Sequence, residues 1–236
     1  MRALLLAAGL GTRLRPLTES LPKCLVPIAG QPVLAHWLEA LFDDPRIERV
    51  LVNTHYLADQ VAAAVEAMPW RERVDLVHEP QLLGTGGTVL ANRRWLGEGP
   101  WFVAHADNLT DAPVAHIIDP HLAERGSVAM TMLAFRTPTP STCGILQLDA
   151  RGRVVGFHEK VDNPPGNLAN GAVYVLEPEV LDRIAAVGRP VVDLSTEIIP
   201  ALVPRILAVE YGGFFMDIGT NDALAWARVH FPGRDC

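Results

Sequence analysis

The first half of the chain alternates short apolar runs with amphipathic segments, and this alternation restricts the possible folds more than any other feature. A short, continuous apolar run next to glycine or proline is typical of a strand covered on both faces. Strands that alternate with helices favour a parallel sheet with helices on its faces, joined by right-handed crossovers. The apolar runs are residues 2–8, 48–56, 73–80 and 101–108, and the helical patterns between them are residues 32–44, 57–68 and 87–96.

The second half has a different pattern, with strands that follow one another directly. The strands within 144–160 are separated by the turn DARGR, which predicts antiparallel pairing. We see no repeat or linker that would separate independent domains. The expected fold is α/β and Rossmann-like, a mixed, mainly parallel sheet flanked by helices with a small antiparallel layer. The further predicted strands are residues 127–135 and 169–178 and two short strands within 205–220, and the further helices are residues 178–188 and 221–231.

Composition excludes several classes of protein. The formal net charge of −7, from 27 acidic and 20 basic residues, argues against broad nucleic-acid binding, which needs a basic face. No apolar segment approaches the roughly 20 residues that cross a bilayer, and no secretory signal precedes Arg13. The odd set Cys24, Cys143 and Cys236 has no metal-like spacing, which favours reduced thiols in the cytoplasm. We therefore expect a cytoplasmic protein that binds neither nucleic acid nor membrane.

A glycine-rich turn follows the first predicted strand, in the stretch LLLAAGLGTRLRPLT. Such turns can present backbone N–H groups to phosphate, because glycine permits a positive φ and a close approach. Leu14 occupies the position of the third glycine of a dinucleotide fingerprint, and no P-loop string occurs here. A guanidinium at Arg13 can fork two phosphate oxygens, and Lys23 supplies a compact charge. A structural turn with two solvated cations is the alternative.

The two stretches AAGLGTRLRPLT and PKCLVPIAGQPVL together resemble the signature of the sugar-1-phosphate nucleotidyltransferases. Cys24 departs from that signature where proline is common, and Ala106 stands where the family has glycine. The segment LLGTGGTVL resembles the family's base-binding loop, especially that of guanylyltransferases for mannose 1-phosphate and heptose 1-phosphate. Further resemblances occur in the expected order at HADN, TCGIL, FHEKV, ANGAVYV and FMDIGT.

The resemblance implies the nucleotide-diphospho-sugar transferase fold over one domain, residues 1–236. Residues 1–112 would be mainly the nucleotide-binding half and residues 113–236 mainly the sugar-binding half. The implied reaction joins an NTP, GTP foremost, to a sugar 1-phosphate of mannose or heptose type and releases pyrophosphate. Mg²⁺ is the implied cofactor, because it prefers hard oxygen ligands such as carboxylates. A homodimer is compatible with the resemblance, and no appended acyltransferase domain is expected.

The resemblance also assigns the site residues. Arg13, Lys23 and Asp107 would be catalytic, and Asp107 and Asp217 would hold the metal. Read singly, either aspartate could instead cap a turn, and Glu159 with Lys160 could be an ordinary exposed pair. The implied nucleotide-binding residues are Ala8, Gly9, Gly11, Thr12, Arg13, Glu79, Gly84 and Thr85, and the implied substrate-binding residues are Asn108, Gly144, Glu159, Lys160, Asn170 and Gly171.

Alternatives stay open at the level of substrate and of class. UTP with N-acetylmuramate 1-phosphate or another amino-sugar 1-phosphate is the second choice, and CTP with phosphocholine is the third. A non-catalytic regulatory homologue is a different class, since a fold alone does not establish activity. Such a protein would be free to lose its charged positions, whereas Arg13, Lys23, Asp107, Lys160 and Asp217 are all present. A nicotinamide-dependent oxidoreductase is disfavoured by Leu14.

Overall fold

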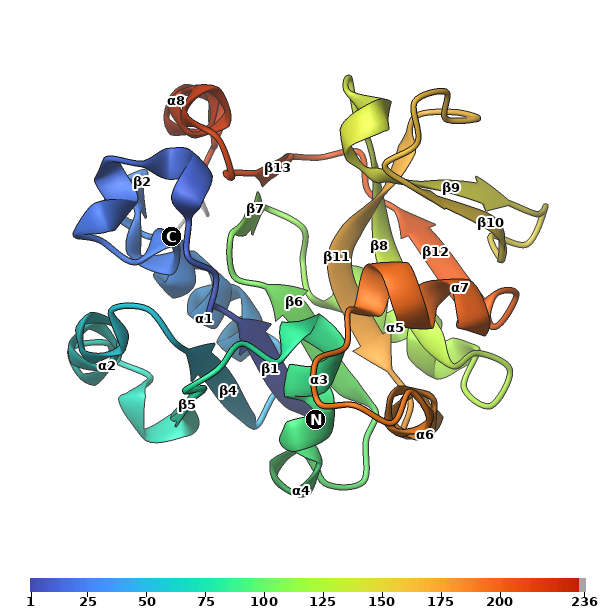
Figure 1. Cartoon of the computed structure of the whole chain (residues 1–236), viewed down its shortest axis with the longest axis horizontal. Coiled ribbons are helices and arrows are strands. Elements are labelled where there is room, and N and C mark those ends of the chain that lie inside the picture. Colours follow the sequence, from blue (N-terminus) through green and yellow to red (C-terminus); the bar gives the residue numbers. More distant parts are fainter. Residues whose placement is uncertain (234–236) are drawn as a thin grey trace. The chain divides into compact units, whose positions relative to one another are not determined.

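The computed structural model describes residues 1–233, which divide into two compact units (Figure 1). Unit 1 comprises residues 1–82, 104–114 and, among the described residues, 213–233. Unit 2 comprises residues 83–103 and 115–212. Both units are therefore built from segments that are distant in the sequence, and the chain returns to unit 1 for its last strand and helix.

Unit 1 contains three parallel strands, β1 (Arg2–Leu6), β4 (Arg49–Thr54) and β5 (Val74–His78). The helix α1 (Val33–Asp43) follows β1 in the chain, and α2 (Ala58–Glu66) connects β4 to β5. These elements confirm the alternation predicted from the sequence. Parallel pairing follows because each connection carries a helix between two strands that run the same way.

Two small antiparallel sheets complete unit 1 with the last helix. The strand β2 (Pro27–Ile28) pairs with β3 (Gln31–Pro32), and β7 (Asn108–Thr110) pairs with β13 (Phe215–Asp217). The helix α8 (Asn221–His230) is capped at its N-terminus by Thr220, whose hydroxyl accepts a hydrogen bond from the Ala223 N–H. Short 3₁₀ turns occur at Thr12–Leu14, Leu17–Glu19, Lys23–Leu25 and Arg71–Arg73.

Unit 2 is dominated by antiparallel pairs, as the second half of the sequence predicted. The hairpin of β9 (Gly144–Leu148) and β10 (Val154–Glu159) turns at the DARGR segment. The long strand β11 (Leu168–Leu176) pairs with β8 (Met130–Arg136) and with β9, while β12 (Ile206–Glu210) runs parallel to β8. The strand β6 (Trp101–His105) leads from unit 2 into unit 1.

The helices of unit 2 differ from the sequence prediction in three places. The helix predicted over 87–96 begins three residues earlier and is divided at Asn92 into α3 (Gly84–Ala91) and α4 (Arg93–Leu96). The helix α5 (Ala115–Ala123) was missed because it contains Pro120, which normally indicates a break. A π-helical turn at Leu194–Ile198 and the short α7 (Ile199–Leu202) were also missed. The helix α6 (Glu179–Ala186) lies where one was predicted.

The fold class predicted from the sequence is confirmed: a mixed, mainly parallel sheet flanked by helices, with small antiparallel sheets. Leu4 and Leu5 in unit 1 and Val175 and Leu176 in unit 2 have no exposed surface, so each unit has an apolar interior. Among the described residues, no helix combines the length and apolar character needed to cross a bilayer.

Candidate functional site

A cluster of two cations and two carboxylates forms in unit 1 from four positions that are far apart in the sequence. The Lys23 Nζ lies 2.5 Å from Asp107 Oδ2 and 3.4 Å from Asp217 Oδ1. The Arg13 Nη2 lies 3.8 Å from Asp217 Oδ2. Lys23 is buried, with 8% of its side chain exposed, whereas 50% of Asp217 and 64% of Arg13 is exposed. The cluster thus has a buried ammonium, whereas its guanidinium and one carboxylate are exposed to solvent.

Strand ends place the two carboxylates. Asp107 follows β6 and precedes β7, and Asp217 is the last residue of β13. The pairing of β7 with β13 sets Asp217 opposite Asn108, and the Ile218 N–H donates to the Asp107 carbonyl over 3.2 Å. Backbone pairing therefore holds the two aspartates together before any side-chain contact forms.

Lys23 keeps Asp107 ionised. Burial acts to raise the pKa of the Asp107 carboxyl, but the charge of Lys23, the electrostatic effect of His105 and the hydrogen bond from Lys23 together more than compensate, and the net effect is a lowered pKa. A charged hydrogen bond of this kind is stronger than a neutral one. The protein therefore presents a negative carboxylate at this position at neutral pH.

The glycine turn after β1 is fixed by one residue to which the sequence analysis gave no role. Gly11 has a φ of 63°, in the left-handed region that glycine adopts without strain. The Thr18 hydroxyl donates to the Gly11 carbonyl over 2.7 Å. Thr18 is the last residue of the stretch LLLAAGLGTRLRPLT, so this motif could have drawn attention to it. Ala8 is buried, while Gly9 and Thr12 are exposed on the same turn.

Gly219 was also missed, and it controls the approach of Arg13 to Asp217. A Cβ atom at position 219 would lie 2.6 Å from Arg13 Nη2 and 2.9 Å from Asp217 Oδ1. Any side chain there would push the guanidinium or the carboxylate away. The FMDIGT string contains this glycine, but only the aspartate was interpreted.

The predicted nucleotide residue Glu79 is buried next to the three parallel strands of unit 1. The Asn53 Nδ2 donates to Glu79 Oε1 over 3.0 Å, and the Asn53 Oδ1 accepts from the Ala7 N–H over 2.7 Å. Asn53 therefore connects the end of β1 to Glu79, and no sequence motif identified it. The predicted substrate residue Asn108 is buried in β7, and its carbonyl accepts from the Trp37 indole N–H over 2.7 Å.

The predicted base-binding segment in unit 2 is a helical turn rather than a loop, which corrects the sequence interpretation. Gly84 and Thr85 open α3, and the N–H groups of Gly86 and Gly87 donate to the Val192 carbonyl over 2.8 and 3.1 Å. The helix can begin at Gly84 because an acceptor outside the helix is available for two N–H groups of its first turn, which have no partner within it.

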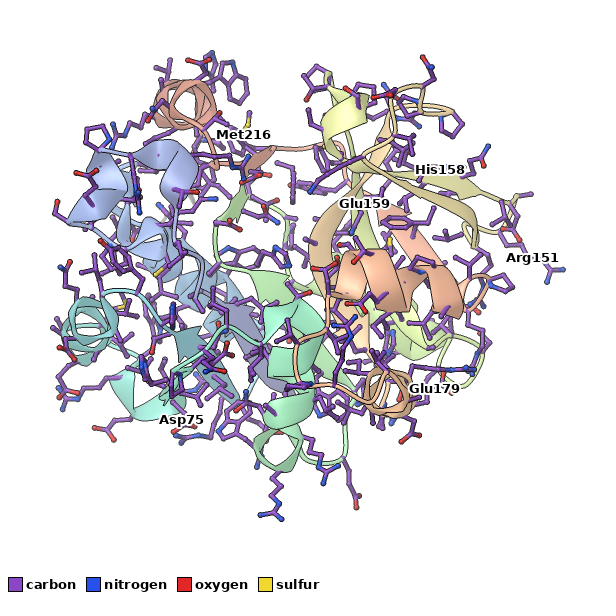
Figure 2. All side chains as sticks on the ribbon, viewed as in Figure 1. Asp75, Arg151, His158, Glu159, Glu179 and Met216 are labelled. Atoms are coloured by element: carbon purple, nitrogen blue, oxygen red, sulfur yellow. The ribbon has the colours of Figure 1, made fainter. Side chains whose placement is uncertain are left out.

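The predicted sugar residues Gly144 and Glu159 lie opposite each other on β9 and β10 of unit 2. Figure 2 labels the Glu159 side chain. A Cβ at Gly144 would lie 2.5 Å from Glu159 Oε2, so the absence of a side chain there makes room for the carboxylate. Lys160 is 66% exposed, its Nζ lies 3.4 Å from Glu159 Oε1, and its φ is 50°. A positive φ is unusual for lysine, and such strain is common at functional positions.

Asn170 and Gly171 lie on β11 of unit 2 where its pairing with β8 is irregular between Asn170 and Tyr174. The Asn170 Oδ1 accepts from the Ala172 N–H over 2.9 Å, and its Nδ2 donates to the Tyr174 hydroxyl over 2.8 Å. The Asn170 amide is therefore oriented by two contacts within the strand. Gly171 is buried in the same irregularity.

The described cysteines fit a structural role rather than a nucleophilic one. Burial raises the pKa of the Cys24 thiol to about 12, so it stays protonated. Cys143 is half-buried and is a free thiol. Cys236 lies outside the described residues.

A hard divalent cation fits the carboxylate pair. Asp107 and Asp217 each direct an oxygen at one positively charged atom, the Lys23 Nζ, so both can serve a single cation. Mg²⁺ typically uses one or two carboxylates together with water and substrate phosphate. Among residues 1–233, no group of three or more His, Cys, Asp or Glu side chains could hold a metal ion, so the site would rely on ligands from water and substrate.

Comparison with known proteins identifies the family. The profile of the nucleotidyl transferase family matches residues 2–231. The chain belongs to this family. A fold comparison agrees, because a structure from Bacillus anthracis, described as a glucose-1-phosphate thymidylyltransferase, superposes with a TM-score of 0.87. That match covers 100% of this chain and 97% of the other, at 18% identity, and it supports the fold alone.

Curated relatives in the nucleotidyl transferase family carry a narrower name. The catalytic subunit beta of mannose-1-phosphate guanylyltransferase from Drosophila melanogaster is 34% identical over 92% of this chain and 59% of its own length. Mannose-1-phosphate guanylyltransferase from Mycobacterium tuberculosis is 34% identical over 93% of this chain and 61% of its own length. The chain thus spans about three-fifths of the length of these relatives.

Proposed function

We propose that the chain is a sugar-1-phosphate nucleotidyltransferase. A phosphate oxygen of the sugar 1-phosphate attacks the α-phosphorus of an NTP and forms a new P–O bond. The bond from the α-phosphorus to the β-phosphate oxygen breaks, and pyrophosphate leaves with that electron pair. The observation that carries the proposal is the Lys23 ammonium between Asp107 and Asp217, with Arg13 beside them.

The two cations have different tasks in this reaction, because both reactants are anions that repel each other. Arg13 is exposed on the glycine turn, and its planar fork suits the oxygens of the nucleotide phosphates. Lys23 is buried and held by two carboxylates, so its charge is fixed in place for the phosphate group that reacts. Positioning and electrostatic stabilisation of this type supply most of the catalysis in phosphoryl-type transfer.

Asp107 and Asp217 are the proposed ligands of Mg²⁺, which would neutralise phosphate charge and orient the phosphate oxygens when bound. The lowered pKa of Asp107 supports this role, since the carboxylate is available without loss of a proton. The reaction needs no protein base, because the attacking phosphate is already deprotonated near neutral pH.

We further propose that GTP and a sugar 1-phosphate of mannose or heptose type are the substrates. The names of the 34% identical relatives support GTP and mannose 1-phosphate, and the LGTGG string supports the same base. In unit 2, Glu159, Asn170 and Lys160 provide an acceptor, an amide and a cation that suit sugar hydroxyls and a phosphate. We also propose a cytoplasmic location, which the free thiols of Cys24 and Cys143 support.

Pyrophosphate release from a substrate panel tests the proposal. Each of four NTPs is mixed with mannose, heptose, glucose and N-acetylmuramate 1-phosphates and with phosphocholine, with and without Mg²⁺. Turnover that requires both substrates and Mg²⁺, and is fastest with GTP, is the expected result. Fastest turnover with UTP or CTP would replace the substrate assignment but keep the reaction. Absence of pyrophosphate release over the whole panel would favour a non-catalytic homologue.

A further inference from the structure

The segment 190–195, here called the strap, holds the first turn of α3 in unit 2. The Val192 carbonyl accepts from the N–H groups of Gly86 and Gly87, and the Val192 N–H donates to the Leu83 carbonyl over 2.9 Å. The strap is therefore bonded to the glycine segment through backbone atoms in both directions. Contacts of this kind fix the relative position of two chain segments.

Close packing explains why this part of α3 is rich in glycine. A Cβ at Gly84 would lie 2.6 Å from the Val192 carbonyl oxygen, and a Cβ at Gly87 would lie 2.2 Å from the Pro190 carbonyl oxygen. Real Cβ atoms do not approach backbone oxygens this closely. The glycines at 84 and 87 therefore accommodate the strap, whatever the segment binds.

Thr85 uses its hydroxyl to hold the strap. The Thr85 Oγ1 accepts from the Leu194 N–H over 2.7 Å and donates to Asp193 Oδ2 over 3.3 Å. The other oxygen of Asp193 accepts from the Thr196 N–H over 2.9 Å at the start of the π-helical turn. The Thr85 hydroxyl, predicted to lie at the nucleotide, thus hydrogen-bonds within the protein. Asp193 connects this hydroxyl to the π-helical turn Leu194–Ile198.

The same strap reaches the predicted sugar residue Asn170. The Ser195 side chain hydrogen-bonds to the hydroxyl of Tyr174, which also accepts from the Asn170 Nδ2 over 2.8 Å. Tyr174 has no exposed surface, and burial raises the pKa of its hydroxyl, so it remains a neutral hydrogen-bonding group. The strap therefore reaches Thr85 through Asp193 and reaches Asn170 through Ser195 and Tyr174, and Asp193 caps the turn Leu194–Ile198 that contains Ser195.

We propose that the strap is a positioning element shared by both substrate sites: through Asp193 it sets the glycine segment, and through Ser195 and Tyr174 it sets the Asn170 amide. This inference rests on the proposed function, in which the glycine segment receives the nucleotide base and Asn170 the sugar. Thr85, Asp193, Ser195 and Tyr174 are positioning residues, since each acts through another group.

Steady-state kinetics test the two ends of the strap separately. Thr85→Val removes the hydroxyl at equal volume and is expected to raise KM for the NTP about tenfold, the loss of roughly one hydrogen bond, with kcat within about twofold. Tyr174→Phe should raise KM for the sugar phosphate by about the same factor. Asp193→Ala should raise the KM for the NTP and the KM for the sugar phosphate. The variant Thr85→Ser should restore the NTP KM.

Two controls address nonspecific effects in the same unit. The Thr131 hydroxyl hydrogen-bonds with the His121 ring, and the Tyr211 ring packs against His116. Thr131→Val and Tyr211→Phe make the same chemical changes and should leave both KM values within about twofold of wild type. Equal KM changes in the controls and in Thr85→Val and Tyr174→Phe would overturn the proposal.

Hydrogen exchange at the Gly86 and Gly87 amides gives a readout that needs no substrate. Thr85→Val and Asp193→Ala should speed exchange at both amides about tenfold, while amides of β11 keep wild-type rates. Unchanged exchange in both variants overturns the proposal. Faster exchange with unchanged KM for the NTP also overturns it, although the proposed function would stand. Absence of pyrophosphate release by the wild-type protein over the substrate panel would instead contradict the proposed function. Hydrogen exchange at Gly86 and Gly87 would still show whether the strap holds α3.

Discussion

The charged cluster of unit 1 and the strap of unit 2 both connect residues that are distant in the sequence, but they do so with different chemistry. In unit 1, Lys23 contacts Asp107 and Asp217 through full charges. In unit 2, the neutral hydroxyl groups of Thr85 and Tyr174 contact the strap, at the Leu194 N–H, the Asp193 carboxylate and the Ser195 side chain. Charges act directly on anionic substrates, whereas neutral groups of this kind define geometry.

This difference predicts different kinetic consequences. A charge next to the reacting phosphates changes the energy of the transition state, so its removal lowers kcat. A hydrogen bond that only orients a binding segment changes the population of the binding-competent arrangement, so its loss appears in KM. The following predictions test this division, from the largest expected effect to the smallest.

Asp107→Asn should have the largest effect. It removes one negative charge from the cluster while the side-chain volume is kept, and we expect kcat to fall at least about a hundredfold. Circular dichroism should show an unchanged fold. Asp75→Asn is a suitable control, because Asp75 forms an ion pair with Arg49 on the surface of unit 1 (Figure 2). Near wild-type turnover in Asp107→Asn would remove this residue from the site.

Lys23→Met should distinguish two effects of the Lys23 ammonium, one on turnover and one on metal affinity. Without Lys23, turnover should fall about a hundredfold or more, because a fixed positive charge is lost. Affinity of the nucleotide-free protein for Mn²⁺ should instead rise about tenfold, since the ammonium no longer competes for Asp107 and Asp217. Electron paramagnetic resonance of free Mn²⁺ measures this affinity. Unchanged Mn²⁺ affinity would show that the two carboxylates do not share a cation site.

The sequence supported the cluster better than the strap, for physical reasons. Strands β1, β4 and β5 and their helices were predicted because apolar runs and helical spacing are local patterns. Arg13, Lys23, Asp107 and Asp217 were assigned because they lie within short motifs that resemble those of a known family. The structure places these four side chains in one cluster, and their positions in the sequence alone could not show this.

Residues that were missed depend on contacts between distant segments. Asp193 lies in no recognised motif, and its partner Thr85 is 108 positions away. Tyr174 was read as part of an apolar strand, and its hydroxyl matters only because Ser195 and Asn170 reach it. Gly87 lies in the segment interpreted as a base-binding loop but received no role of its own, and the Pro190 carbonyl fills the space next to it. No local pattern encodes such proximity.

Substitution of two glycines by alanine should distinguish structural from ligand-directed glycines. Gly87→Ala places a Cβ against the Pro190 carbonyl and should lower the free energy of unfolding by about 1–3 kcal/mol, the usual cost of overpacking. At Gly9, a Cβ meets no atom within 4 Å, so Gly9→Ala should leave stability unchanged. Urea unfolding measures both effects. The KM for the NTP should rise in Gly9→Ala if the turn receives phosphate. Equal stability of the two variants would contradict the close packing of α3 against the strap.

The smallest expected effect concerns pH and a buried histidine of unit 2 outside both sites. His121 contacts the Thr131 hydroxyl and the Glu177 carboxylate over 2.9 and 3.3 Å. Burial lowers the pKa of the imidazole, against the opposing attraction of Glu177. The unfolded chain therefore binds a proton more readily than the folded one, so the free energy of unfolding should fall as pH drops below about 6.5 and should be fully regained above that value.

Urea unfolding of wild type and His121→Gln at pH 5.5, 6.5 and 7.5 measures this dependence. The variant should be less stable at pH 7.5, because a buried side chain with two polar contacts is altered, but its stability should vary less over the range. Arg125 also contacts Glu177, over 3.1 Å, so Arg125→Gln serves as a control that alters this neighbourhood without removing the imidazole. A wild-type stability that is constant over this range would show that the attraction of Glu177 balances burial, and one that rises as the pH falls would show that this attraction outweighs burial. Either result would contradict the lowered pKa.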